Sequence, residues 1–191
     1  MPRIVLGPTS TAQWHALVSE AEAACECRLG EELESYLVFL LMRFAARPDL
    51  ASRVMALEFL RSMRAQGALQ TEQLRDVGDQ CLLYSGFYPE RAERRLVRVG
   101  YYVDMGRSAY GLLAERLRHA AAEVYARLSE GFVSLRDVLS AMREMDPQAT
   151  LDPLVQAEIW LETGSEHARR RLAETTGSAP MPLDAPPRRR H

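Results

Sequence analysis

The chain has 191 residues, of which 47% are hydrophobic and 26% charged, and its formal net charge is −2. This length fits one globular domain, and the composition excludes collagen-like, low-complexity and highly charged disordered chains. Folding of a chain of this size buries about 70% of the surface that the unfolded chain exposes, so a core requires neither disulfides nor a metal.

More than half of the residues are Ala, Leu, Met, Glu, Gln or Arg, which lose little entropy in a helix, whereas Val, Ile and Thr are scarce. Apolar positions recur at three- and four-residue spacing between Gly and Pro breakers, a period that predicts amphipathic helices. The predicted helical segments are about 11–28, 31–46, 49–66, 71–84, 89–130, 134–145, 153–163 and 165–174.

These segments predict an all-α fold, a single bundle of about seven to nine helices. Residues 1–10 are expected to form an N-terminal arm and 11–174 the helical bundle domain. Residues 175–191 are rich in Pro, Arg and small side chains, a composition that predicts a disordered tail.

The chain carries no apolar run that is typical of a secretory signal or of a membrane span. The longest continuous run, 36–42, is far short of the roughly 20 residues that a span requires. We therefore expect a cytoplasmic protein without membrane contact. Cys25, Cys27 and Cys81 are then expected as thiols, and Cys25 and Cys27, two apart on a helix, as side chains on different faces.

The segment 75–115 concentrates tyrosines, arginines and glycines. If 100–119 is one helix, Tyr101, Asp104 and Ser108 share one side of it. Arg75 and Asp79, one turn apart on the preceding helix, are expected to face the same side. This pattern predicts a cleft for a small polar ligand, lined by Arg75, Asp79, Tyr101, Asp104 and Ser108. The other interpretation of these charges is a set of ion pairs between helices or at the surface.

The opposite side of the same helix carries Tyr102, Gly106 and Tyr110. Tyrosine, Met and Arg are enriched at interface cores, so these three residues are the expected contact surface of a self-associating module. Glycines at 100, 106 and 111 each cost about 1 kcal/mol inside a helix relative to Ala, which predicts a break or a close helix contact there.

Motifs of known chemistry are absent from the sequence. It has no Gly-rich phosphate loop and no nucleophile elbow, and none of its four histidines follows a Glu by three residues as a di-iron centre requires. No cofactor, no metal ligand and no catalytic residue is therefore predicted. Arginine runs at 169–171 and 188–190 are basic, but the chain as a whole is slightly acidic, so nucleic acid is not the expected partner.

Two functions follow from these patterns. The first is a non-catalytic protein–protein interaction module that self-associates as a homo-oligomer or binds another protein. The alternative is a small-ligand-binding or enzymatic bundle, whose site lies between the fourth and fifth helices.

Overall fold

A computed structural model describes residues 10–46, 59, 62–63, 66–90 and 97–177. All elements in this part of the chain are helical, which confirms the all-α prediction. They are α1 (Ser10–Ala24), α2 (Glu31–Ala46), α4 (Gly67–Phe87), α6 (Val99–Arg116), α7 (His119–Glu130), α8 (Phe132–Glu144), the 3-10 turn η2 (Pro147–Ala149), α9 (Pro153–Thr163) and α10 (Glu166–Thr176). The predicted arm, the predicted helix 49–66 and the predicted tail lie largely or wholly outside the described residues.

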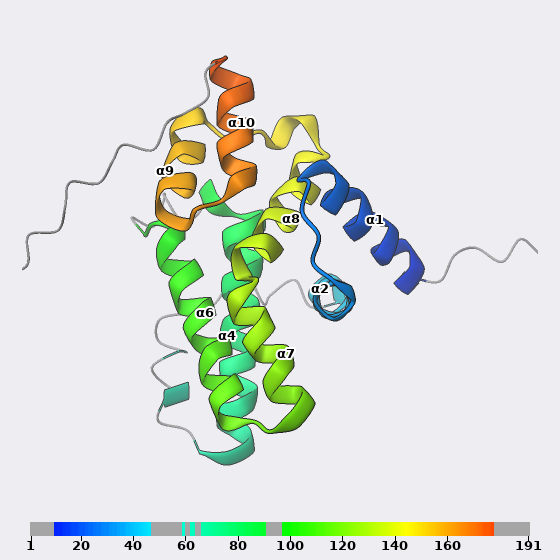
Figure 1. Cartoon of the computed structure of the whole chain (residues 1–191), viewed down its shortest axis with the longest axis vertical. Helices are drawn as coiled ribbons and strands as arrows, with labels where there is room; N and C mark the ends of the chain where they lie inside the picture. The colour runs from blue at the N-terminus through cyan, green and yellow to red at the C-terminus, as the bar shows by residue number, and fades with distance from the viewer. Residues whose placement is uncertain (1–9, 47–58, 60–61, 64–65, 91–96, 178–191) are drawn as a thin grey trace, which may run out of the picture.

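Helix α4 forms the centre of the bundle. All residues from Val77 to Gly86 are buried, because α6 covers one side of α4 and α8 covers another. Figure 1 shows α4 and α6 side by side along the long axis, with α7 and α8 beside them. Helices α1 and α2 pack against each other, α1 also contacts α8, and α9 and α10 form a pair at one end.

Local chemistry sets several of the helix ends. Three glutamates, Glu31, Glu32 and Glu34, occupy the first turn of α2, and Arg43 lies in its last turn, so both ends complement the helix dipole. The Asp152 side chain accepts a hydrogen bond from the backbone N–H of Leu154 and caps α9, and Ser165 caps α10 in the same way.

Several predicted boundaries differ from the structure, and α4, for example, runs from Gly67 to Phe87 and not from 71 to 84. Helix α1 ends at Ala24 and not near residue 28, because Glu26 adopts a left-handed backbone with φ 49°. The expected continuous helix 100–119 ends at Arg116, and α7 begins at His119 with φ 58°. No helix of the described ranges is both long and apolar enough to cross a membrane.

Candidate functional site

The Asp79 carboxylate accepts three hydrogen bonds in the centre of the bundle. Its Oδ1 accepts hydrogen bonds from the Tyr36 hydroxyl at 2.7 Å and from the Tyr110 hydroxyl at 2.6 Å. The Arg43 guanidinium donates to its Oδ2. Asp79 is only 2% exposed, so α2, α4 and α6 are joined through one buried carboxylate.

Burial governs the ionisation of this cluster. Desolvation raises the pKa of Asp79, and Arg43 and the two tyrosine hydroxyls oppose that rise. Desolvation also raises the pKa values of Tyr36 and Tyr110, and the nearby Asp79 charge adds to both shifts. Both tyrosines therefore stay protonated and act as hydrogen-bond donors to the carboxylate at neutral pH.

A close approach between α4 and α6 positions Tyr110 over Asp79. Gly78 leaves the space that the Tyr110 ring occupies, since a Cβ atom at Gly78 would overlap that ring. The Tyr110 ring also packs edge-on against Tyr36, with ring centroids 6.2 Å apart. Packing against Gly78 and against Tyr36 therefore fixes the position of the Tyr110 hydroxyl that donates to Asp79.

The structure does not bring the five residues of the predicted cleft together. Asp79 faces the buried side of α6, whereas Tyr101, Asp104 and Ser108 lie on the exposed side of α6. The Ser108 hydroxyl donates to the Asp104 backbone carbonyl at 2.8 Å, within its own helix. Arg75 is partly exposed, and its Nε lies 3.9 Å from an Asp76 carboxylate oxygen. The division of α6 into two sides is as predicted, but its polar side faces away from Asp79.

The three residues of the predicted interface lie inside the chain. Tyr102 is 5% exposed and Tyr110 fully buried. Gly106 allows α6 to approach α4 and α8, because a Cβ atom there would lie 2.9 Å from the Cys81 Cβ and would overlap the Phe132 ring. These residues form contacts between helices of one chain, so another face has to provide any contact with a partner.

A second buried polar network joins α8 to α10 and was not predicted from the sequence. Arg136, only 1% exposed, donates to Asp137 at 2.8 Å, to the Ser165 hydroxyl at 3.2 Å and to the Ser85 carbonyl at 3.3 Å. The Ser165 hydroxyl in turn donates to Asp137 at 2.6 Å. Ser165 after Gly164 predicts the N-cap of α10, but a cap does not by itself predict the contact with α8.

Glu144 forms the outer part of this network. Its carboxylate lies 3.0 Å from His167 Nε2, 3.0 Å from Arg171 Nε and 3.1 Å from Arg143. Burial acts to raise the pKa of Glu144, but the hydrogen bond and charge of His167, with the two arginines, lower it overall. The arginine run 169–171 is likewise engaged with carboxylates, on Glu166, Glu26 and Glu174 as well as Glu144.

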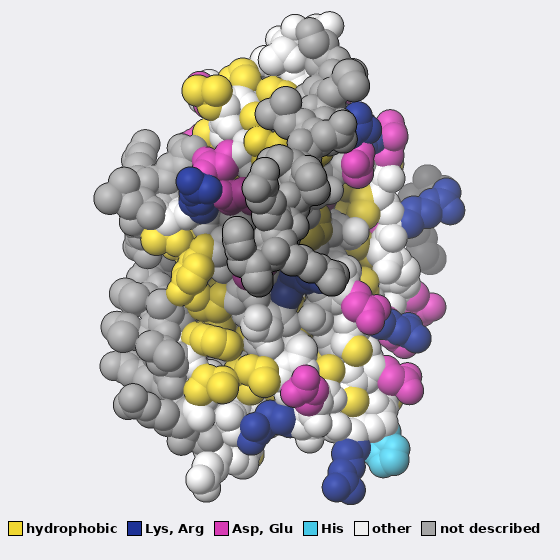
Figure 2. Space-filling model, turned by 60° about the vertical axis from the view of Figure 1, so that its left-hand side comes forward, with side chains coloured by type: hydrophobic (Ala, Val, Ile, Leu, Met, Phe, Trp, Pro, Cys, Tyr) yellow, Lys and Arg dark blue, Asp and Glu magenta, His cyan; other side chains and the backbone are white. Residues whose placement is uncertain are grey.

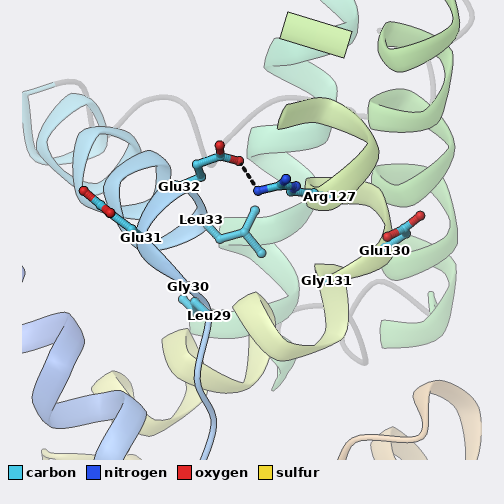
Figure 3. Close-up of a pocket in the computed structure, with 8 residues that line it drawn as sticks. All are labelled: Leu29, Gly30, Glu31, Glu32, Leu33, Arg127, Glu130 and Gly131. Carbon is cyan, nitrogen blue, oxygen red and sulfur yellow. Dashed lines mark hydrogen bonds and ion pairs between the residues drawn. The ribbon is translucent and has the colours of Figure 1, made fainter. Parts of the chain in front are cut away.

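Two cavities lie away from Asp79 and Arg136. The one in Figure 3, of about 580 Å³, lies between the start of α2 and the α7–α8 turn, and an ion pair of Glu32 with Arg127 at 2.6 Å spans it. Another, of about 630 Å³, lies beside the end of α1. Within the described ranges, no group of three or more His, Cys, Asp and Glu side chains is placed to hold a metal ion.

Helix α9 is apolar on both its inner and its outer side. Val155 and Ile159 face the core, while Leu154 is 80% exposed and Leu161 64% exposed. Leu154, Ala157 and Leu161 follow each other at three- and four-residue spacing, so they form one stripe, here called the outward face of α9. Figure 2, turned so that the α9 side comes forward, shows hydrophobic side chains at the upper end of the molecule.

Comparisons of the chain with protein-family models, with curated proteins and with solved structures give no match.

Proposed function

We propose that this chain is a non-catalytic interaction module that acts in the cytoplasm and self-associates, with the outward face of α9 as its contact surface. The observation that supports the proposal is the exposure of Leu154 and Leu161 on a helix whose other side is already buried. A helix with apolar side chains on its outer as well as its inner side is typical of a helix covered on both sides. Burial of a leucine side chain contributes about 1.5–3 kcal/mol, so burial of Leu154 and Leu161 under a partner favours association.

The spacing of the two leucines favours a second copy of the same chain as the partner. Leu154 and Leu161 are seven residues apart, about 10.5 Å along a helix. In an antiparallel pair of α9 helices around a two-fold axis, Leu154 of each chain lies over Leu161 of the other. Such a self-complementary contact is the usual form of a homodimer interface.

Charge at the edge of this face is compatible with the pairing. Glu158, one residue beyond Ala157, has its carboxylate 3.5 Å from the Arg98 guanidinium, which also donates to Glu162 at 3.0 Å. The two glutamates nearest the proposed axis are therefore neutralised in part within each chain, which reduces repulsion between two copies.

The alternative, a ligand site between α4 and α6, has weaker support. The oxygens of Asp79 already accept hydrogen bonds from Tyr36, Tyr110 and Arg43, so this carboxylate has little capacity left for a ligand. Tyr101, Asp104 and Ser108 lie on a convex helix surface and do not face a second wall formed by Arg75 and Asp79.

Sedimentation equilibrium over a range of concentrations tests the proposal. The wild-type mass is expected to rise from the 21.6 kDa of one chain toward twice that value. The double variant Leu154→Glu/Leu161→Glu is expected to remain monomeric, and the control Leu69→Glu, at a leucine 57% exposed on α4, to behave as wild type. A wild-type protein that stays monomeric, or a double variant that associates normally, would overturn the proposal.

A further inference from the structure

The end of α1 brings two cysteines together. Beyond Ala24 the N–H of Cys27 donates to the Glu22 carbonyl at 3.0 Å, and the N–H of Glu26 donates to the Ala23 carbonyl at 3.3 Å. With Glu26 in the left-handed region, this pair of bonds is a Schellman turn. The turn ends the helix before Cys27, so Cys25 and Cys27 lie on one bend, in contrast to the different faces expected from a continuous helix, and each thiol shifts the pKa of the other.

The two thiols have opposite environments. Cys25 is 2% exposed, whereas Cys27 is partly exposed and lines the cavity of about 630 Å³. The neighbouring Cys25 thiol acts most strongly to lower the pKa of Cys27, to about 7 against the opposing effect of burial, while Cys27 and burial raise the pKa of Cys25. The thiolate is the nucleophilic form of cysteine, so the lowered pKa and the greater exposure both favour Cys27 over Cys25 as the attacking residue.

Neighbouring helices hold this turn in place. The Cys27 thiol lies 3.9 Å from the Ser134 backbone carbonyl of α8. From α10, the Arg170 guanidinium donates to the Cys25 carbonyl and pairs with Glu26 at 2.5 Å. In a fully extended chain, the Cα atoms of residues two apart are at most about 7 Å from each other. A bend shortens this distance into the range that a disulfide bridges, about 4.4–6.8 Å between Cα atoms.

We propose that Cys25 and Cys27 are a thiol–disulfide exchange pair, with Cys27 as the attacking and Cys25 as the resolving cysteine, for small disulfides that carry positive charge. The Cys27 thiolate attacks one sulfur of the disulfide R–S–S–R, which forms a mixed disulfide and releases one thiolate RS⁻. The Cys25 thiol then loses its proton and attacks the Cys27 sulfur, which forms the Cys25–Cys27 disulfide and releases the second RS⁻. Both electrons removed from the two cysteines reduce R–S–S–R to two thiols, so the small disulfide is the oxidant.

The charge of the cavity supports the preference for cationic disulfides. Its lining includes the carboxylates of Glu22, Glu26 and Glu34 and the guanidinium of Arg28, and Glu26 also pairs with Arg170, so one negative charge remains in excess. A mouth with an excess of negative charge raises the local concentration of cations and lowers that of anions. Cystamine, which carries two ammonium groups, is therefore expected to react faster than the anionic oxidised glutathione.

The test is to mix the reduced full-length protein with cystamine or oxidised glutathione, quench with acid and map the products by mass spectrometry. The wild type should show a first adduct on Cys27 and then lose it to give the Cys25–Cys27 disulfide. The rate ratio of cystamine to oxidised glutathione should exceed that of a free small thiol by about threefold or more. A first adduct on Cys25, a mixed disulfide that persists, or a ratio equal to that of the free thiol would overturn the proposal.

Three variants distinguish the role of Cys27 from that of Cys25. Cys27→Ser should form no adduct on the time scale of the wild type, and Cys25→Ser should stop at the mixed disulfide on Cys27. Cys81→Ser is the control, because Cys81 is fully buried in α4 and burial raises its pKa, so its loss should leave the reaction unchanged. A Cys27→Ser protein that reacts as fast as wild type would also contradict the assignment. The order of adducts in the wild type gives the same answer without any variant.

Discussion

The Tyr110 hydroxyl on α6 donates a hydrogen bond to the buried Asp79 carboxylate on α4 at 2.6 Å. The same carboxylate also binds Tyr36 and Arg43 on α2, so three helices depend on one side chain. The role that follows for Asp79 is structural, and its loss should be measured as lost stability.

Asp79→Ala is expected to lower the free energy of unfolding by about 3–5 kcal/mol, because the change leaves Arg43 and two tyrosine hydroxyls without their acceptor. Chemical denaturation followed by circular dichroism measures the change. The control Asp104→Ala removes an exposed carboxylate of α6 and should stay within about 0.5 kcal/mol of wild type. Equal effects of the two substitutions would contradict the structural role of Asp79.

Two glycines of α6 should respond to alanine in opposite directions. Gly106→Ala forces a methyl group against Phe132 and Cys81 and should destabilise the protein by about 1–3 kcal/mol. Gly111→Ala meets only the Ser129 Oγ at 3.6 Å, an ordinary contact, and should stabilise it by about 0.5–1 kcal/mol. Thermal melts of both variants measure the two changes in stability. A neutral or stabilising effect of Gly106→Ala would show that α6 does not approach α4 and α8 this closely.

Replacement of an arginine should cost much more stability in a buried ion pair than in an exposed one. Arg136→Ala leaves Asp137 buried without its cation and should cost about 3–5 kcal/mol. Arg127→Ala breaks the pair with Glu32 at the surface, where both side chains are about half exposed, and should cost about 1 kcal/mol or less. Urea unfolding of the two variants gives the comparison, and a cost for Arg136→Ala as small as that for Arg127→Ala would be inconsistent with the buried network.

The Glu144 cluster predicts a loss of stability in acid. The folded-state pKa of Glu144 lies below its ordinary value of 4.5, so its contribution is complete above about pH 4.5 and is lost as the pH falls through the folded-state pKa. Glu144→Gln lacks this contribution at every pH. The difference in unfolding free energy between wild type and Glu144→Gln should therefore stay constant at higher pH and shrink as the pH falls below about 4.5, and a difference that stays constant there would contradict the assigned shift.

The sequence predicted the helices and the two sides of α6 because both depend on local spacing. Tyr102, Gly106 and Tyr110 face inward and Tyr101, Asp104 and Ser108 outward, as the period of 3.6 residues requires. The partner of Asp79 was not predictable in the same way. Tyr36 and Arg43 lie 43 and 36 residues before it, and only the tertiary packing of α2 on this part of the bundle brings them close.

The environment of the cysteines depended on a single backbone angle. Glu26 is an ordinary helix former, so spacing alone predicted that α1 would run past Cys27, whereas its left-handed conformation ends the helix and brings the two thiols together. Arg136 and Asp137 were missed for a related reason. Their charges lie within an apolar helical stretch, and their partners Ser165 and Ser85 come from helices distant in sequence.

The most direct test of the proposed self-association is an isotope-filtered nuclear Overhauser experiment on a mixture of methyl-labelled and unlabelled chains. Pairing of two α9 helices predicts cross-peaks from the methyl groups of Leu154 in one chain to those of Leu161 in the other. Intermolecular cross-peaks that involve other helices but not α9, or none at concentrations where the chain sediments as a dimer, would contradict the proposed contact surface.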